Sequence, residues 1–114
     1  MTEAQVSKKL RDALNELPNT VCWKISDRFN ASRPDLIICH AGEFLAIETK
    51  VHPNRLTPLQ QLTLDTLRKA GADTYVATYH KGTKLLSLLH EEYGHQITFK
   101  DIKDAALWLL RPRS

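Results

Sequence analysis

Apolar residues recur along this chain with two different periods, and these periods predict helices and strands in alternation. Between residues 2 and 17, apolar positions recur every three or four residues, which is typical of a helix with one buried face. Thr2 and Gln5 form a capping-box pattern at its start. A second helix is expected over residues 57–70, where Pro58 takes the first helical position after a capping threonine. Its buried face is predicted from the spacing of six residues: Leu59, Leu62, Thr63, Thr66, Leu67 and Ala70.

Short apolar runs bounded by turn-forming residues predict four strands, at residues 21–26, 36–39, 44–47 and 73–79. The second and third runs are separated by His40-Ala41-Gly42-Glu43, so they are expected to form a β-hairpin. Both runs are apolar on both faces, which is typical of strands covered by helices on two sides. The predicted order, α-β-β-β-α-β, fits an α/β sandwich with a central sheet flanked by helices.

The C-terminal third is expected to be a helical extension of this sandwich. Four leucines between residues 82 and 93 fit a short helix better than a strand. Thr98, with Asp101 three residues later, predicts the start of a final helix whose apolar positions run from Ile102 to Leu110.

The composition limits the class of protein. A chain of 114 residues is expected to form one domain over residues 1–114. Apolar residues make up 42% and charged residues 25%, as in soluble globular proteins, and no run approaches the ~20 apolar residues of a membrane span. The charged N-terminus lacks a signal-peptide segment and the two cysteines fit buried thiols, so a cytoplasmic setting is expected. The net charge of +3 is compatible with nucleic-acid binding without being diagnostic.

Two acidic residues occur where the surrounding positions are apolar. If the hairpin loop is centred on Ala41-Gly42, Asp35 sits directly opposite Glu48, with both side chains on one face and their Cβ atoms roughly 5 Å apart. Lys50, two residues past Glu48, points to the same face. Facing like charges destabilise a sheet unless something compensates them, and Mg²⁺ bound by the two carboxylates would do so.

Two alternatives remain open at this point. Carboxylates are most often solvated, so the hairpin face could carry scattered charges and no ligand. A loop of three or five residues would also put Asp35 and Glu48 on opposite faces of the sheet. The apolar surroundings of the pair favour the metal site.

Further candidates surround this pair. Glu3 lies on the same arc of the first helix as its apolar residues, so it either approaches the site or complements the helix dipole in the first turn. Gln60 is expected to close the capping box of the second helix. Basic residues near the site are candidates for phosphate binding, although each by itself is also compatible with an ordinary surface position: Lys24, Arg28, Arg33, Lys50 and Arg55.

Four motifs, in this order, resemble a known family. Pro-Asp at positions 34–35 and Glu-Thr-Lys at 48–50 match the PD-(D/E)XK motif of the restriction-endonuclease-like nucleases. Arg-Leu-Thr-Pro-Leu-Gln at 55–60 and Ala-Gly-Ala at 70–72 resemble the VRR-NUC branch of that superfamily. The resemblance covers roughly residues 1–79. One position departs from the family pattern, since Ser32 stands where a glycine is usual.

This resemblance implies a restriction-endonuclease-like core and a metal-dependent DNA endonuclease. Asp35, Glu48 and the backbone carbonyl of Thr49 would hold one or two Mg²⁺ ions, for which Mn²⁺ should substitute, with Glu3 as an additional metal-site candidate. Lys50 would orient the attacking water or stabilise the developing negative charge.

The resemblance also gives the supporting residues and partners. Gln60 would help to orient water or phosphate beside Lys50, and one amide is not expected to serve both the helix cap and the site. Arg28, Arg33, Arg55 and Lys24 would contact DNA. Stand-alone proteins of this size look like phage or bacterial nucleases that act as homodimers on branched DNA, including four-way junctions, with neither an organic cofactor nor a membrane. An inactive nucleic-acid-binding or partner-binding module of the same fold is the alternative, and the complete Asp/Glu/Lys set argues against it.

Overall fold

The structure is a computed structural model of the chain, and it describes residues 1–25, 33–91 and 93–112. Its elements, in chain order, are α1 (Glu3–Asn15), β1 (Thr20–Lys24), β2 (Leu36–His40), β3 (Glu43–Val51), α2 (Pro58–Lys69), β4 (Asp73–His80), β5 (Leu85–His90), β6 (Gln96–Phe99) and α3 (Ile102–Leu109). None of these helices is both long and apolar enough to cross a membrane.

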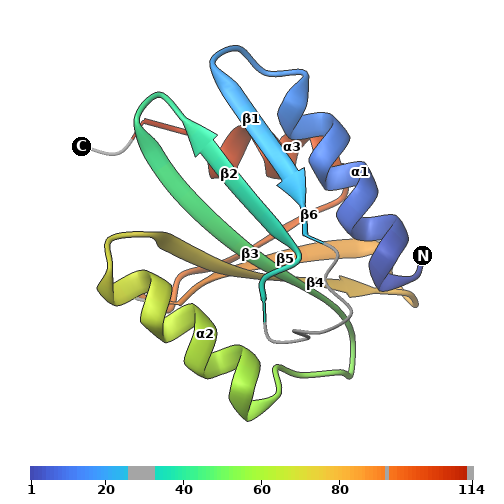
Figure 1. Cartoon of the computed structure of the whole chain (residues 1–114). Helices are drawn as coiled ribbons and strands as arrows, with labels where there is room; N and C mark the ends of the chain where they lie inside the picture. The colour runs from blue at the N-terminus through green and yellow to red at the C-terminus, as the bar shows by residue number, and fades with distance from the viewer. Residues whose placement is uncertain (26–32, 92, 113–114) are drawn as a thin grey trace.

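The strands form one mixed sheet in the order β1-β2-β3-β4-β5-β6 (Figure 1). Among the described strands only β3 and β4 pair in parallel, because α2 provides the crossover between them. Helices α1 and α3 pack on one face and against each other, whereas α2 packs over β4 on the other face. Two neighbours on β3 mark the faces, since Thr49 contacts Ser7 of α1 and Glu48 contacts Gln60 of α2. The predicted α/β sandwich with a mixed, helix-flanked sheet is confirmed.

The main core lies between the sheet and the α1/α3 pair. Helix α1 contributes three fully buried residues, Val6, Leu10 and Leu14, on the face that its periodicity predicts. They pack over the α1-facing residues of the central strands, which include Leu36, Leu45, Ile47, Tyr75 and Leu88. The capping box of Thr2 and Gln5 begins α1 as expected.

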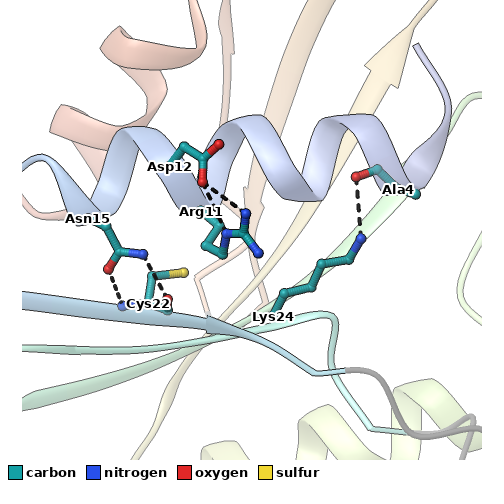
Figure 2. A network of polar contacts seen from close by, with 6 residues as sticks. All are labelled: Ala4, Arg11, Asp12, Asn15, Cys22 and Lys24. Carbon is teal, nitrogen blue, oxygen red and sulfur yellow. Dashed lines mark hydrogen bonds and ion pairs between the residues drawn. The ribbon is translucent and has the colours of Figure 1, made fainter.

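Polar contacts attach α1 to the edge strand β1 (Figure 2). The Asn15 side chain accepts a hydrogen bond from the Cys22 amide at 2.7 Å and donates one to the Cys22 carbonyl at 2.9 Å. In the first turn, at the other end of the helix, the Lys24 ammonium lies 3.5 Å from the Ala4 carbonyl. Burial raises the pKa of the Cys22 thiol to about 12, so this cysteine is a packing residue.

Two predictions about the elements are wrong. The leucines of residues 85–89 form strand β5 instead of a helix, because pairing with both β4 and β6 satisfies their backbone and buries Leu86 and Leu88. Thr98 belongs to β6, so Asp101 is the N-cap of α3. The C-terminal third therefore adds two strands to the sheet before its final helix.

The predicted buried face of α2 is also wrong. Leu64 is the buried residue of this helix, while Leu59 and Leu62 are 57% and 59% exposed. The two-sided cover expected for the hairpin is similarly incomplete. Strands β1 and β2 extend beyond α2, so Trp23 of β1 is 65% exposed on the face that carries α2.

Candidate active site

The hairpin register brings the two carboxylates of the motif together. His40 pairs with Glu43 across a two-residue turn, and Ala41 and Gly42 both have positive φ, at 48° and 84°, as a type I′ turn requires. The ladder ends with Leu36 opposite Ile47, so the next facing pair is Asp35 and Glu48. The register predicted from the sequence is confirmed, and loops of three or five residues are excluded.

Asp35 is held in place by its partner strand. Its Oδ2 accepts hydrogen bonds from the Thr49 amide at 2.8 Å and from the Thr49 hydroxyl at 2.7 Å. When the register of β2 and β3 is continued past Leu36 and Ile47, Thr49 faces Pro34. The bond from the Thr49 amide to the Asp35 carboxylate therefore adds one hydrogen bond beyond the last backbone pair of the ladder. The Asp35 carbonyl also accepts a bond from the Ile25 amide at 2.8 Å. Both the backbone and the side chain of this residue are thereby fixed.

Ser7 of α1 supports this arrangement from the opposite face of the sheet. Its hydroxyl lies 2.6 Å from the Thr49 hydroxyl, and both residues are buried. The single hydroxyl hydrogen of Thr49 goes to Asp35, so Ser7 must donate to Thr49. The resulting chain of bonds runs from α1 to the carboxylate. Sequence reasoning missed Ser7, and the signal for it was a hydroxyl beside Val6 on the buried side of an amphipathic helix.

Glu48 is a buried carboxyl group, 3% exposed, with one oxygen engaged and one without a partner. Its Oε1 accepts a hydrogen bond from Gln60 Nε2 at 3.2 Å. Within the described part of the chain, its Oε2 has no hydrogen-bond donor. An orphaned buried oxygen is costly for a carboxylate, so this site requires either a proton or a cation.

The surroundings of Glu48 raise its pKa to about 9. Burial contributes most, and the negative charge of Asp35, together with a hydrogen bond between the two carboxyl groups once Glu48 is protonated, raises the pKa further. Lys50 lowers the pKa of Glu48 through its positive charge, and Glu3 raises it slightly. Without a cation, Glu48 is therefore protonated at neutral pH.

Gln60 performs two roles that were expected to compete. Its Oε1 accepts the Thr57 amide hydrogen bond at 2.9 Å and closes the capping box of α2, as predicted. Its Nε2, at the other end of the same amide, donates to Glu48. The cap and the contact with Glu48 use different atoms of the amide, so the two do not compete, and the predicted role of Gln60 toward water or phosphate stays a prediction.

The family model of the VRR-NUC domain matches residues 1–81 of the chain. The chain belongs to the VRR-NUC family. No curated protein sequence matches it significantly.

Solved structures agree with this VRR-NUC assignment at the level of the fold. The chain is similar to Archaeoglobus fulgidus Hjc, described as a Holliday junction resolvase from an archaeal hyperthermophile, with a TM-score of 0.62 and 17% identity over 90% of this chain and 98% of that one. It is also similar to a structure described as a VRR_NUC domain, with a TM-score of 0.58 and 23% identity over 73% of this chain and 90% of that one. The core is therefore the restriction-endonuclease-like core that the motifs implied.

Two of the remaining candidate residues of this VRR-NUC protein, Lys50 and Glu3, act on Glu48 of the carboxylate pair through their charges. Lys50 is 7% exposed and shares the Glu48 face of β3. Glu3 is half-buried in the first turn of α1 and acts on Glu48 through its charge. Among residues 1–25, 33–91 and 93–112, no three His, Cys, Asp or Glu side chains group at metal-binding spacing, so Glu3 does not complete a triad with Asp35 and Glu48.

The basic residues predicted to contact DNA are spread over β1 and the segments that border β2 and β3. Arg33 and Arg55 are exposed in the segments that precede β2 and follow β3. Lys24 extends along the N-terminal part of α1, as its contact with Ala4 shows. Arg28 lies outside the described residues. These positions leave the assignment of the DNA-contacting residues as a prediction.

The residues present fit a hard divalent cation. Asp35 uses only Oδ2 for its bonds to Thr49, and Glu48 has an orphaned buried oxygen. Carboxylate oxygens are the ligands that Mg²⁺ prefers, and a bound cation would remove the cost of two facing acids.

Proposed function

We propose that this VRR-NUC protein is a divalent-metal-dependent DNA endonuclease that hydrolyses phosphodiester bonds. The observation that carries the proposal is the buried, partnerless oxygen of Glu48 in a carboxyl group that faces Asp35. A solely structural pair of facing acids would be an unexplained cost in the middle of a sheet. A cation site explains that cost and accounts for the lysine two residues away.

Asp35, Glu48 and the backbone carbonyl of Thr49 would hold Mg²⁺, or Mn²⁺ in its place. The bound ion would lower the pKa of a water molecule and neutralise negative charge on the phosphate under attack. Asp35 reaches the site already oriented by Thr49 and Ser7, so little ordering of this ligand is needed on binding. Glu48 would lose its proton on binding the cation, and Gln60 would keep its other oxygen in place.

Lys50 supplies positive charge to the reacting phosphate. Its ammonium group is carried on the same face as Glu48 and interacts with that residue electrostatically. In a site as buried as this one, a preoriented cation stabilises negative charge on phosphate oxygens far better than it would in water. We assign Lys50 to orienting the attacking water or stabilising the developing oxyanion, with Gln60 in support.

We further propose branched DNA, including four-way junctions and flaps, as the substrate, and a homodimer as the active form. Two observations support this substrate class: the VRR-NUC family match, and the likeness in fold to a protein described as a Holliday junction resolvase. Contacts to the phosphate backbone are assigned to the basic residues Lys24, Arg28, Arg33 and Arg55. Binding through such contacts weakens as salt increases.

Cleavage of matched duplex, flap and four-way DNA tests the proposal, with Mg²⁺, with Mn²⁺ and with a chelator. The wild type is expected to cut in either metal and to stop in chelator, whereas Asp35→Ala and Lys50→Ala should be inactive. Asp104→Ala, an exposed acid on α3, is the matched control and should cut normally. Cleavage that persists in Asp35→Ala would refute the site. DNA binding without cleavage in any metal would indicate a binding module, and absence of DNA affinity at low salt a partner-binding domain.

A further inference from the structure

Two histidines lie side by side at the ends of β3 and β4, on the face of the sheet that carries Lys50. The rings of His52 and His80 stack, with their centroids 4.9 Å apart and their planes inclined by 29°. Val51 and Tyr79, which precede the two histidines in the chain, belong to the core under α1. Because a strand alternates its side chains between its two faces, both histidines point to the opposite face, as Lys50 does. We refer to His52 and His80 together as the histidine platform.

Hydrogen bonds hold the histidine platform in place. The His52 amide donates to the Tyr79 carbonyl at 2.9 Å, which adds one bond to the parallel ladder of β3 and β4. His80 Nε2 lies 3.4 Å from the Ser87 hydroxyl, and this hydroxyl lies 3.2 Å from that of Thr98. Ser87 is only 5% exposed, so the support under His80 is a buried one. Side chains that are ordered in advance lose little conformational entropy when a ligand binds.

The outer face of the platform is open. His52 is exposed, whereas His80 is half-buried beside it. In the described part of the chain, the His52 ring stacks on one other ring, that of His80. One face of the His52 ring is therefore covered and the other is left for a ligand.

The orientation of the two rings favours a flat ligand over a metal ion. An imidazole binds zinc through a lone pair in the plane of its ring, at a distance of ~2.0–2.1 Å. Two stacked rings inclined by only 29° do not direct such lone pairs at a common point. Within residues 1–25, 33–91 and 93–112, no group of three His, Cys, Asp or Glu side chains has metal-binding spacing. A third flat ring, in contrast, continues the stack.

The position of the platform identifies that third ring. His52 follows Glu48 by four residues of extended chain, which is roughly 13 Å. Stacked nucleotides rise ~3.4 Å each, so this distance corresponds to about four nucleotides of a stacked strand and to fewer of an unstacked one. We propose that the histidine platform stacks an unpaired base of the DNA strand that is cut, within a few nucleotides of the cleaved phosphate.

The platform would select DNA by its structure. A base inside a duplex has both faces covered by its neighbours, so only an unpaired, splayed base can place a face on His52. Aromatic side chains stack such bases with little sequence preference. The inference rests on the proposed nuclease function for its substrate, and it specifies the feature that separates flaps and frayed branch points from matched duplex.

Binding of flap and matched duplex DNA in Ca²⁺, measured without cleavage, tests the platform. His52→Ala should weaken flap binding roughly 10-fold, the size of one contact between a base and an aromatic ring, and leave duplex binding unchanged. His52→Phe keeps a flat ring without a nitrogen or a charge, so it should restore flap binding.

His95→Ala is the matched control and should bind both DNAs as the wild type does. His95 is also an exposed histidine, but it follows the end of β5 that lies far from His80. Circular dichroism should show the His52 variants folded, because the side chain of His52 is exposed.

Photo-cross-linking locates the contact. Iodouracil in DNA links on irradiation to an aromatic side chain stacked on it, and it can be placed at successive unpaired positions beside the cut. Peptide mass spectrometry should find the link at position 52 in the wild type and in His52→Phe, and no link at this position in His52→Ala.

Unchanged flap binding in His52→Ala would overturn the inference. An equal loss of flap and duplex binding, or a His52→Phe variant that binds as weakly as His52→Ala, would also overturn it, because either result would indicate a phosphate contact in place of stacking. These results leave the nuclease proposal intact, since cleavage depends on Asp35 and Glu48. Conversely, a protein whose platform passes these tests but which cuts DNA in no metal would refute the proposed activity alone.

Discussion

The substitution Glu48→Gln separates the loss of folding stability caused by a buried negative charge from the use of that charge in binding a cation. Glutamine has nearly the same shape as glutamate, can still accept the hydrogen bond from Gln60, and cannot ionise. In the folded protein without metal, the pKa of Glu48 is raised from 4.5 to about 9, chiefly by burial. A carboxyl group with a raised pKa binds more protons in the folded than in the unfolded state between these two values. Folding stability therefore falls as pH rises from 4.5 toward 9.

The magnitude follows from the shift. One pKa unit corresponds to about 1.4 kcal/mol, and pH 8 lies about 3.5 units above 4.5. At pH 8 the carboxyl group of Glu48 is ionised in the unfolded chain but still holds its proton in the folded one, and this difference lowers the unfolding free energy by on the order of 3–5 kcal/mol. At pH 5 the cost is below about 1 kcal/mol. Relative to wild type, the unfolding free energy of Glu48→Gln should be higher by several kcal/mol in metal-free buffer at pH 8, and nearly equal at pH 5.

Urea denaturation at both pH values, in chelator and in Mg²⁺, measures these differences. Mg²⁺ should stabilise the wild type at pH 8, because the cation binds the ionised carboxylate, and should leave Glu48→Gln unchanged. Metal binding to the wild type at pH 7 should release close to one proton, detectable in buffers of different ionisation enthalpy. Parallel pH profiles for the two proteins in chelator would refute the reasoning, since they would show that Glu48 does not titrate abnormally.

Three further predictions concern the residues around Glu48. Ser7→Ala removes the hydrogen-bond donor to Thr49, so urea denaturation should show an unfolding free energy lower by about 1–2 kcal/mol, and calorimetry should show roughly 10-fold weaker Mn²⁺ binding. Unchanged metal affinity would show that Ser7 does not position Asp35. Gln60→Glu keeps the cap acceptor but replaces the donor to Glu48 with a charge, so helix content should hold while the Glu48 carboxyl titrates at higher pH by NMR. The logarithm of the DNA-binding constant, measured in Ca²⁺, should fall linearly with the logarithm of salt concentration, and Arg55→Ala should reduce the steepness of that line by about 1 if Arg55 contacts a phosphate.

Local chemistry let the sequence determine the two helix starts and the hairpin. A threonine with a glutamine three residues later specifies a capping box whatever lies elsewhere, as at the start of α1 and of α2. The positive φ values of Ala41 and Gly42 select a two-residue turn, and that turn sets the register that makes Asp35 face Glu48. The central pair of the candidate site was therefore predictable, because a strand reverses its exposed face at every residue.

Contacts between distant segments were decided only by the tertiary structure. Strand β5 is a run of leucines that suits either a helix or a strand, and pairing on both of its edges makes it a strand. Helix α2 has an apolar stripe in its sequence, yet the hydrogen bonds from Gln60 to Glu48 and from Gln61 to Glu91 turn Leu64 inward and leave Leu59 and Leu62 of that stripe exposed. Ser7 and Thr49 are 42 positions apart, and no local rule relates them. The raised pKa of Glu48 likewise required the folded chain, because desolvation depends on everything packed around the carboxyl group.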